Sequence, residues 1–174
     1  MPEFPEIPLG RGKIFIPIGD GTEMMDTLYP IFRLREEGYE PVVSGPDARL
    51  YNGVMHEIPP GESVRWDITR EQPTYHVRAT IAFRDARPDD YVGLFLSGGR
   101  APEYLRYDKH LMDLVRAFFA ANKPVAMVCH GVELAAAAMD TALEANVRLS
   151  FDAFVPMMQQ WRDDIVQHRC GLDA

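Results

Sequence analysis

The stretch PVAMVCHGVELAAAA at residues 124–138 decides the fold of this chain. Its first five residues form a short apolar run, which is typical of a strand buried on both faces of a sheet. The residues from Val132 onward are rich in alanine and predict a helix. Cys129-His130-Gly131 therefore occupies a tight turn between a buried strand and a helix, and this pairing is the repeating unit of a parallel α/β sheet.

The same alternation of strand and helix recurs on the N-terminal side of this stretch. Residues 13–18 are apolar and rich in isoleucine, and they end at the turn cluster Gly19-Asp20-Gly21. Asp108 is expected to cap a helix that carries one apolar stripe. The expected strands are 13–18, 40–44, 77–83, 92–97 and 124–128, and the expected helices are 22–37, 108–121 and 132–138. This order predicts a mostly parallel sheet with helices on both faces.

Length and punctuation predict one domain. The chain has 174 residues, which suits a single hydrophobic core. We interpret residues 1–12 as a flexible N-terminal lead-in and residues 13–174 as a single α/β domain. Beyond Ala138 the periodicity weakens, and a strand at 147–155 and a helix at 157–168 are the elements that still fit it.

Composition and charge argue against several classes of protein. The 18 Lys and Arg against 26 Asp and Glu give a formal net charge of −8, and an acidic surface disfavours nucleic acid. No apolar run approaches the roughly 20 residues of a membrane span. The acidic, proline-rich N-terminus differs from a secretory signal, and two cysteines do not make a disulfide framework. We therefore expect a reducing, cytoplasmic location.

The best candidate for chemistry is Cys129. Active sites of open α/β sheets lie beyond the carboxyl ends of the strands, and Cys129 directly follows such an end. A tight turn there lifts the side chain above the sheet, as a nucleophile elbow does. The N-terminus of the following helix favours the thiolate form. The simpler alternative is a buried structural cysteine.

Five further residues at strand ends are candidates for the same site. His130 is either the base that activates the thiol or a partner of a neighbouring group, and its backbone N–H faces an oxyanion beside the sulfur. Glu23 either stabilises the helix dipole or shares a proton with the thiol. Gly98 and Gly99 either offer a second oxyanion N–H or form a plain turn. Glu103 follows in the same segment, where the simpler interpretation is a solvated carboxylate.

We expect neither a cofactor nor a metal ion. Residues 19–22 do not match Gly-x-Gly-x-x-Gly, which argues against a dinucleotide site. The remaining histidines show no spacing that is typical of metal ligands. These are His56, His76, His110 and His168.

Three segments together resemble the ThiJ/PfpI family, within the class I glutamine amidotransferase-like superfamily. They are Glu23–Ser44, Tyr91–Asp108 with its Gly-Gly-Arg-Ala-Pro-Glu sequence, and Asn122–Ala137 around the turn. With residues 76–90 added, the resemblance extends from residue 13 to about 138. Residues 139–174 depart from the family pattern, because the expected Gly-Arg-rich turn and Val-Asp-Gly-Asn turn are missing there.

The resemblance implies a flavodoxin-like three-layer sandwich and a site built around Cys129. It implies that Cys129 is the nucleophile and that Glu23 shares a proton with it. In the PfpI-type branch, His130 pairs with Glu103 of a neighbouring subunit, and the amides of Gly99 and His130 hold the oxyanion. The resemblance also implies a homodimer or a higher homo-oligomer.

Three hypotheses of function remain open. The first is a cysteine-dependent enzyme that acts on a carbonyl carbon, of peptidase-like, glyoxalase III-like or deglycase-like type, with small aldehydes, glycated adducts or short peptides as substrates. The second is a non-catalytic oxidative-stress sensor or chaperone that uses the same cysteine, because an exposed thiolate oxidises readily. The third is a family member with an inert cysteine that is kept for assembly. We expect neither nucleic acid nor a membrane as a partner.

Overall fold

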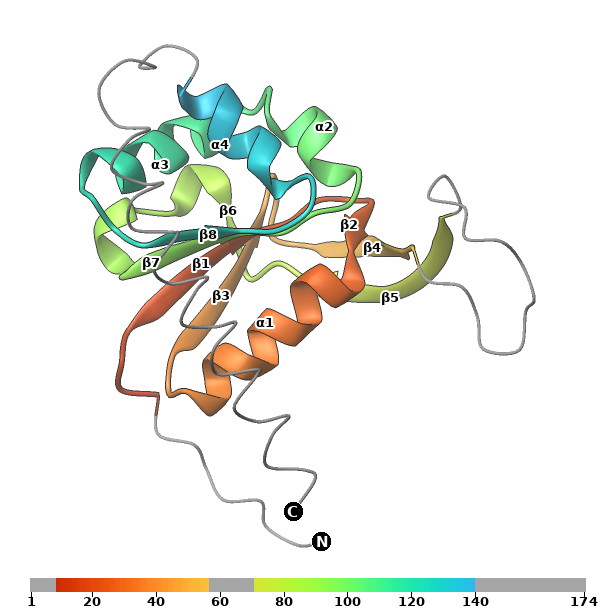
Figure 1. Cartoon of the computed structure of the whole chain (residues 1–174), viewed down its shortest axis with the longest axis horizontal. Coiled ribbons are helices and arrows are strands. Elements are labelled where there is room, and N and C mark those ends of the chain that lie inside the picture. Colours follow the sequence, from red (N-terminus) through yellow and green to blue (C-terminus); the bar gives the residue numbers. More distant parts are fainter. Residues whose placement is uncertain (1–8, 57–70, 140–174) are drawn as a thin grey trace, which may run out of the picture. The chain divides into compact units, whose positions relative to one another are not determined.

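Residues 9–56 and 71–139 are described by the computed structural model of this chain. Within these ranges, five parallel strands form a sheet with the order β6-β3-β1-β7-β8 (Figure 1). The strands are β1 (Lys13–Pro17), β3 (Glu40–Gly45), β6 (Ile81–Ala82), β7 (Gly93–Leu96) and β8 (Val125–Met127). The carboxyl ends of β1, β7 and β8 therefore meet at one edge of the sheet, where the candidate residues lie.

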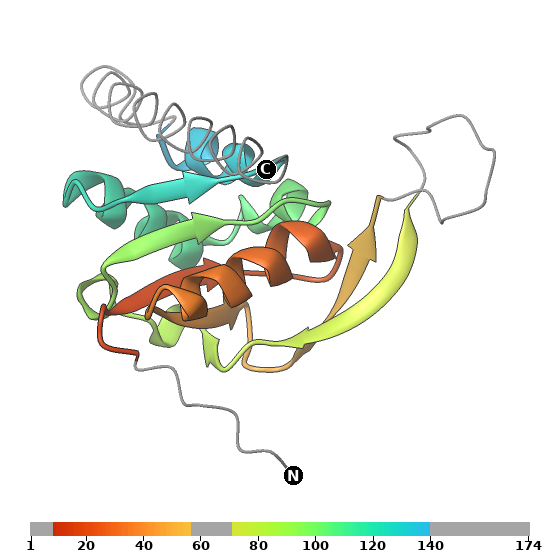
Figure 2. The same ribbon diagram turned by 60° about the horizontal axis from the view of Figure 1, so that its bottom comes forward.

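Helices cover both faces of this sheet. They are α1 (Met24–Glu36), α2 (Ala101–Leu105), α3 (Lys109–Ala120) and α4 (Gly131–Met139). α1 lies on one face, and α3 and α4 lie on the other, as both ribbon views show (Figures 1 and 2). None of these described helices is long and apolar enough to cross a membrane.

The alternation of side chains along β1 divides the core into two layers. Phe15 points to the side of α3 and α4, where it packs edge-on against Tyr91 with ring centroids 5.0 Å apart. Ile16 points to the side of α1, where it packs with Met24. Phe15 and Ile16 are both fully buried, so these successive residues of one strand stabilise opposite layers of the core.

A smaller sheet flanks the main one. It contains β2 (Thr22–Glu23), β4 (Leu50–Met55) and β5 (Gln72–Arg78), with β2 parallel to β4 and β4 antiparallel to β5. β2 leads directly into α1, so the smaller sheet fixes the start of that helix. The ends of β4 and β5 that are nearest to residues 57–70 carry His56 and Glu71, which return in the site below.

Most of the expected elements are confirmed, and one strand is wrong. Asp108 caps α3 through a hydrogen bond from the Leu111 N–H to its Oδ1 at 3.0 Å. The continuous strand expected at 77–83 is instead divided between β5, which ends at Arg78, and the two-residue β6. Phe83 then starts a short 3-10 helix (Phe83–Asp85), because its ring turns into the layer of Phe15. The elements expected at 147–155 and 157–168 lie outside the described residues.

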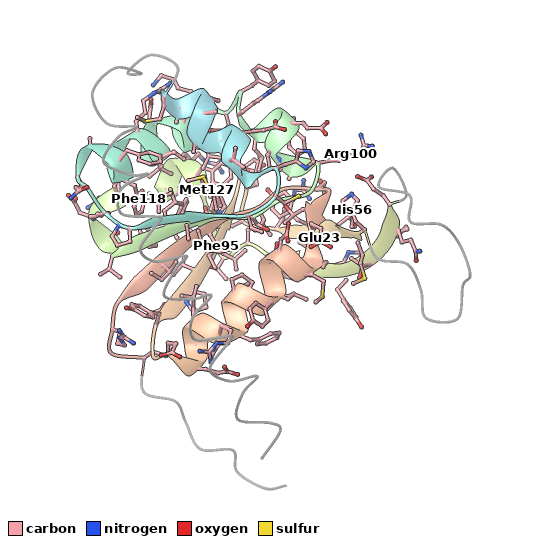
Figure 3. All side chains as sticks on the ribbon, in the orientation of Figure 1. Glu23, His56, Phe95, Arg100, Phe118 and Met127 are labelled. Atoms are coloured by element: carbon pink, nitrogen blue, oxygen red, sulfur yellow. The ribbon has the colours of Figure 1, made fainter. Side chains whose placement is uncertain are left out.

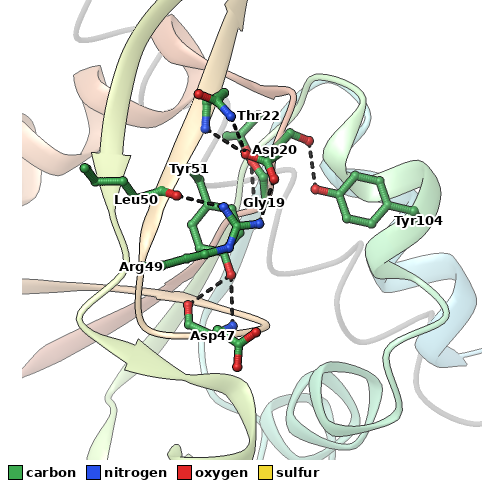
Figure 4. A network of polar contacts seen from close by, with 9 residues as sticks. Gly19, Asp20, Thr22, Asp47, Arg49, Leu50, Tyr51 and Tyr104 are labelled. Atoms are coloured by element: carbon green, nitrogen blue, oxygen red, sulfur yellow. Dashed lines mark hydrogen bonds and ion pairs between the residues drawn. The ribbon is translucent and has the colours of Figure 1, made fainter.

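The turn after β1 is held by a network around Asp20 (Figure 4). Its carboxylate accepts hydrogen bonds from Arg49 Nη2 at 2.7 Å, from Asn52 N at 2.9 Å and from Asn52 Nδ2 at 3.0 Å. Its carbonyl oxygen accepts the Tyr104 hydroxyl at 2.8 Å. The Arg49 hydrogen bond lowers the pKa of Asp20 below its ordinary value of 3.8, although burial acts in the opposite direction. The network fixes the loop that carries β2 and the start of α1.

Candidate active site

Cys129 stands between β8 and α4 in a left-handed backbone conformation. Its φ is +52°, which L residues rarely adopt, and the residue is exposed. The Val128 N–H donates to Leu96 O at 3.1 Å, and the Gly131 N–H donates to Val128 O at 2.9 Å. A side chain at Gly131 would collide with the Leu96 carbonyl oxygen, so the turn requires glycine at that position. The backbone has the shape of a nucleophile elbow, a strained turn from strand to helix.

The carboxylate of Asp26 lies beside this turn. Asp26 belongs to the first turn of α1. A Cβ atom added to Gly98 would collide with Asp26 Oδ2, and would lie 2.5 Å from Cys129 Cβ and 3.0 Å from Cys129 Sγ. The aspartate and the cysteine therefore meet across one glycine. Asp26 Oδ2 is buried and has no hydrogen-bond partner among the residues that the structure describes.

The surroundings of Asp26 raise the proton affinity of its carboxylate. Burial raises the pKa of the Asp26 carboxyl above its ordinary value of 3.8, and the negative charge of Glu23 raises it further. The Cys129 thiol and the rings of His56 and His130 act in the opposite direction. A carboxyl group in this position is able to accept a proton that a neighbouring thiol gives up.

Glu23 is buried behind Asp26. Its Oε2 accepts the Asp26 N–H at 2.7 Å, so Glu23 is the N-cap of α1. Its own N–H donates to Gly98 O at 3.1 Å. Within residues 9–56 and 71–139, no hydrogen bond joins Glu23 to Cys129. The sequence already contained a signal for Asp26, because it follows Glu23 at a spacing of three residues, which brings two side chains to the same side of a first helical turn.

The loops after β1 and β7 are joined at Gly99. Thr22 and Gly99 form an isolated antiparallel bridge, in which the Arg100 N–H donates to Gly21 O at 2.8 Å. Gly99 has a φ of +84°, and a Cβ there would collide with the backbone of Gly21 and Glu23. The N–H groups of Gly99 and His130 donate no hydrogen bond within the described part of the chain. Both are therefore available to an oxygen atom beside the elbow.

His130 lies beside the sulfur, whereas Glu103 does not approach either of them in this chain. The His130 Nδ1 is 3.5 Å from Cys129 Sγ, which is within reach of a hydrogen bond to sulfur. Glu103 is an exposed residue of α2. Its carboxylate makes no hydrogen bond or ion pair with the residues described. The predicted pair of His130 and Glu103 is thus not formed within one chain.

A second polar cluster, which sequence reasoning missed, joins the smaller sheet to the loop after β7. Arg100 Nε donates to Glu71 Oε1 at 2.5 Å, and His56 Nε2 lies 3.2 Å from the same oxygen. Figure 3 labels Glu23, His56 and Arg100 at this end of the molecule. No local pattern predicts the cluster, because 29 positions separate Glu71 from Arg100 and the fold alone brings them together.

Metal ligands do not gather in the described ranges. No group of three or more His, Cys, Asp or Glu side chains there is arranged to hold a metal ion. His76 is an exposed residue of β5 and His110 an exposed residue of α3, so these two lie on separate elements. His168 lies outside the described residues.

The fold and the turn define the class of protein. It is a parallel α/β protein that presents a cysteine between a strand of the sheet and a helix, beside a carboxylate with one buried oxygen. The chain belongs to the DJ-1/PfpI family, whose family model matches residues 12–142. This match confirms the predicted family and, with the observed sheet, the flavodoxin-like three-layer fold.

Relatives and solved structures agree with this assignment. A deglycase from Thermococcus kodakarensis is 32% identical over 122 residues, which are 70% of this chain and 63% of that protein. Deglycase PfpI from Pyrococcus furiosus is 31% identical over 122 residues, again 70% and 63% of the two chains. The match thus spans less than two thirds of these relatives. A crystal structure from Anabaena variabilis, with DJ-1/ThiJ/PfpI-like and ferritin-like domains, superposes with a TM-score of 0.60 at 22% identity, over 74% of this chain and 32% of the other.

Proposed function

We propose that this chain is a deglycase-like or glyoxalase-like enzyme in which Cys129 attacks a carbonyl carbon. The observation that carries the proposal is the pairing of an exposed cysteine at φ +52° with a buried oxygen of Asp26 that has no hydrogen-bond partner among the described residues. Backbone strain and an unsatisfied polar atom each cost stability, and such costs are concentrated at functional sites. The deglycase names of the relatives support this choice of chemistry.

The proposed first step is addition of the thiolate to an aldehyde. Asp26 accepts the thiol proton, and the sulfur of Cys129 forms a bond to the carbonyl carbon. The π electron pair moves to oxygen, where the N–H groups of Gly99 and His130 stabilise the negative charge. Return of the proton from Asp26 to that oxygen completes a hemithioacetal. In this scheme Asp26 performs the proton sharing that the family resemblance had assigned to Glu23, and Glu23 positions Asp26 as its N-cap.

His130 carries the later proton transfers of the proposal. For a 2-oxoaldehyde, the proton on the sulfur-bearing carbon moves to the neighbouring carbon, and the hydroxyl proton of the hemithioacetal moves to the neighbouring carbonyl oxygen, which leaves a 2-hydroxy thioester. Water then hydrolyses the thioester to a 2-hydroxy acid and the free Cys129 thiol. His130 is suited to this transfer because its Nδ1 is 3.5 Å from the sulfur. Addition of the Cys129 sulfur to the carbonyl carbon of a peptide bond would be the first step of a peptidase reaction at the same site.

A second copy of the chain completes the proposed site. Glu103 is exposed and has no partner in the described residues, so we place it against His130 of a neighbouring subunit in a homodimer or higher homo-oligomer. The exposed side chains of Met25, Tyr29 and Phe32 follow one another at spacings of four and three on α1 and offer an apolar stripe. Sedimentation of wild type and Phe32→Lys tests the assembly, and a wild-type chain that sediments as a monomer contradicts it.

The central experiment compares methylglyoxal turnover and peptide hydrolysis by wild type and Cys129→Ser. We expect Cys129→Ser to lose activity by about a thousandfold or more, because the nucleophile itself is replaced. Cys170→Ser is the matched control, since it removes the other cysteine of the chain and should keep wild-type rates. Equal turnover by wild type and Cys129→Ser would end the proposal.

An oxidation sensor is the second candidate, and the exposure of Cys129 is what favours it. Mild peroxide should add oxygen to Cys129 before Cys170, and intact mass followed by peptide mapping measures this order. A sensor without enzymatic activity would show that selectivity and no turnover of any carbonyl substrate. Both candidates require a thiol that stays reduced, which is the reason for placing the chain in a cytoplasm.

A further inference from the structure

Two nitrogen donors converge on a single carboxylate oxygen beside the elbow. Arg100 follows Gly99, His56 follows β4, and Glu71 precedes β5. The Oε1 atom of Glu71 accepts Arg100 Nε at 2.5 Å and lies 3.2 Å from His56 Nε2. The side chains of His56 and Glu71 are largely buried, with 29% and 24% of their surface exposed, whereas Arg100 reaches in from the rim with 58% exposed. Arg100 and His56 thus frame a position that suits a carboxylate oxygen, and Glu71 Oε1 fills it.

Two connections place this position near the sulfur. Arg100 is two residues beyond Gly98, where an added Cβ atom would collide with both Asp26 and Cys129. The His56 ring is close enough to Asp26 to lower the pKa of that carboxyl, against the larger effect of burial. The donors of the cluster and the thiol therefore belong to the same end of the sheet, although they come from separate segments.

We propose that Arg100 and His56 form a carboxylate-binding subsite that Glu71 occupies when no substrate is bound. An ion pair with a half-exposed arginine contributes little net stability, so exchange of one carboxylate for another costs little. The planar guanidinium suits a carboxylate partner. The substrate class is then carbonyl compounds that carry a carboxylate, such as glyoxylate or the glycated ends of amino acids. The substrate class rests on the function proposed above, whereas the subsite itself does not.

The experiment measures recognition at Cys129 without requiring turnover. Alkylation rates are compared for 3-maleimidopropionate and N-ethylmaleimide, and for iodoacetate and iodoacetamide, so that each pair differs by a carboxylate. Peptide mass spectrometry separates Cys129 from Cys170. The quantity of interest is the ratio of the anionic rate to the neutral rate, because this ratio cancels changes in the intrinsic reactivity of the thiol.

Glu71→Gln should raise this ratio about fivefold, since the internal competitor loses its charge, and Arg100→Gln should lower it by a similar factor. Arg100→Lys keeps the charge but loses the planar set of donors. Its ratio of anionic to neutral alkylation rates should therefore lie closer to that of Arg100→Gln than to that of wild type. Arg84→Gln is the matched control, because Arg84 forms a comparably exposed ion pair with Asp47 at 2.8 Å, away from this cluster.

Two outcomes would overturn the subsite. The first is a ratio that stays unchanged in Glu71→Gln and Arg100→Gln, and the second is an Arg100→Lys variant that equals wild type, which would mean general electrostatics alone. Failure of the proposed function looks different: Cys129→Ser would retain turnover while the alkylation ratios of the other variants still shift. Preference for glyoxylate over methylglyoxal in wild type, reversed in Arg100→Gln, would extend the subsite to the substrate.

Discussion

Asp20 and Asp26 lie six positions apart at the same end of the sheet, in opposite electrostatic settings. The carboxylate of Asp20 accepts three hydrogen bonds, and the Arg49 side chain lowers its pKa. Asp26 Oδ2 has no partner in the described residues, and burial raises the pKa of its carboxyl. One aspartate is satisfied by the fold, and the other is left ready to change its protonation state.

The contrast separates an aspartate that supports the fold from the aspartate to which we assign chemistry. The network of Asp20 fixes the loop after β1, and this loop in turn leads through Thr22 and Glu23 into the helix that carries Asp26. The hydrogen-bonded loop around Asp20 therefore positions the start of α1, where Asp26 lowers the stability of the fold. A buried oxygen with no partner in the described residues and a residue in the left-handed region both lower stability. Relieving either cost should raise the free energy of unfolding, whereas replacing Asp20 should lower it.

Among the substitutions that test this contrast between the two aspartates, Asp26→Asn should produce the largest effect. We expect turnover of methylglyoxal to fall by about 100-fold, because the amide cannot accept the thiol proton. Stability should change in the other direction. A raised pKa favours folding below pH 3.8, and that advantage is lost as the pH rises through the folded value, so the ionised carboxylate is a cost at pH 7.

Thermal unfolding at pH 7 measures this cost. Asp26→Asn should raise the free energy of unfolding by about 0.5–1 kcal/mol, in line with other substitutions at strained active sites. Asp26→Glu is the matched variant, since it keeps the acid and should keep part of the activity. A variant Asp26→Asn with full turnover would remove Asp26 from the mechanism.

Gly98→Ala should have the next largest effect, on both stability and the reactivity of Cys129. The added methyl group would collide with Asp26 Oδ2 and with Cys129 Cβ, and forcing atoms into a packed site costs about 1–3 kcal/mol. We expect a lower Tm together with slower alkylation of Cys129. Gly10→Ala is the control, because a Cβ at Gly10 meets nothing within 4 Å. An unchanged alkylation rate in Gly98→Ala would mean that the aspartate and the cysteine do not need their observed spacing.

Asp20→Ala should cost about 1–2 kcal/mol of stability, because it removes three accepted hydrogen bonds from a half-exposed site. The contribution of Asp20 to stability depends on pH in the opposite direction to that of Asp26. A lowered pKa stabilises the fold above pH 3.8, and this contribution is lost as the pH falls through the folded value. Urea unfolding at pH 7 and pH 3 should therefore show a smaller difference between wild type and Asp20→Ala at the lower pH. A difference that grows on acidification would contradict this assignment.

Cys129→Gly should give the smallest change in the free energy of unfolding. Relief of the left-handed conformation should exceed the extra chain entropy of glycine by about 0.5 kcal/mol. Cys129→Ala keeps the strained backbone, and it should therefore show no such gain. Chemical unfolding of the two variants side by side measures the difference, and equal stability would argue that the turn carries no strain.

The parts of the fold set by local signals were predictable from the sequence. The apolar run before Cys129 and the cap at Asp108 define β8 and α3 without any knowledge of the rest of the chain. The strand expected at 77–83 failed because its end depends on a distant partner: Phe83 turns towards Phe15, 68 positions away in the sequence, and breaks the alternation.

The candidate site was predictable in its position but not in its carboxylates. Cys129 follows from local pattern, and the turn of Gly98-Gly99 follows from its place after a buried strand. Which of Glu23 and Asp26 faces the sulfur depends on how α1 begins, and the N-cap hydrogen bond of Glu23 decides it. The cluster of His56, Glu71 and Arg100 has no local signature, since only the pairing of β4 with β5 brings two of its members to the same hairpin end.

The bridge between Thr22 and Gly99 has a consequence for how such a protein can diversify. Backbone hydrogen bonds of this bridge join the loop that leads to Glu23 and Asp26 to the loop that contains Gly99. An insertion in either loop would therefore displace both loops. Within the described residues, His56 and Glu71 at the ends of β4 and β5 are joined to Arg100 through side chains, by the hydrogen bond from Arg100 to Glu71 and the contact of Glu71 with His56. Side chains are exchanged more easily than a backbone bridge, so substitutions at His56, Glu71 and Arg100 are the easiest way to change the proposed substrate preference while Cys129 and Asp26 keep their places.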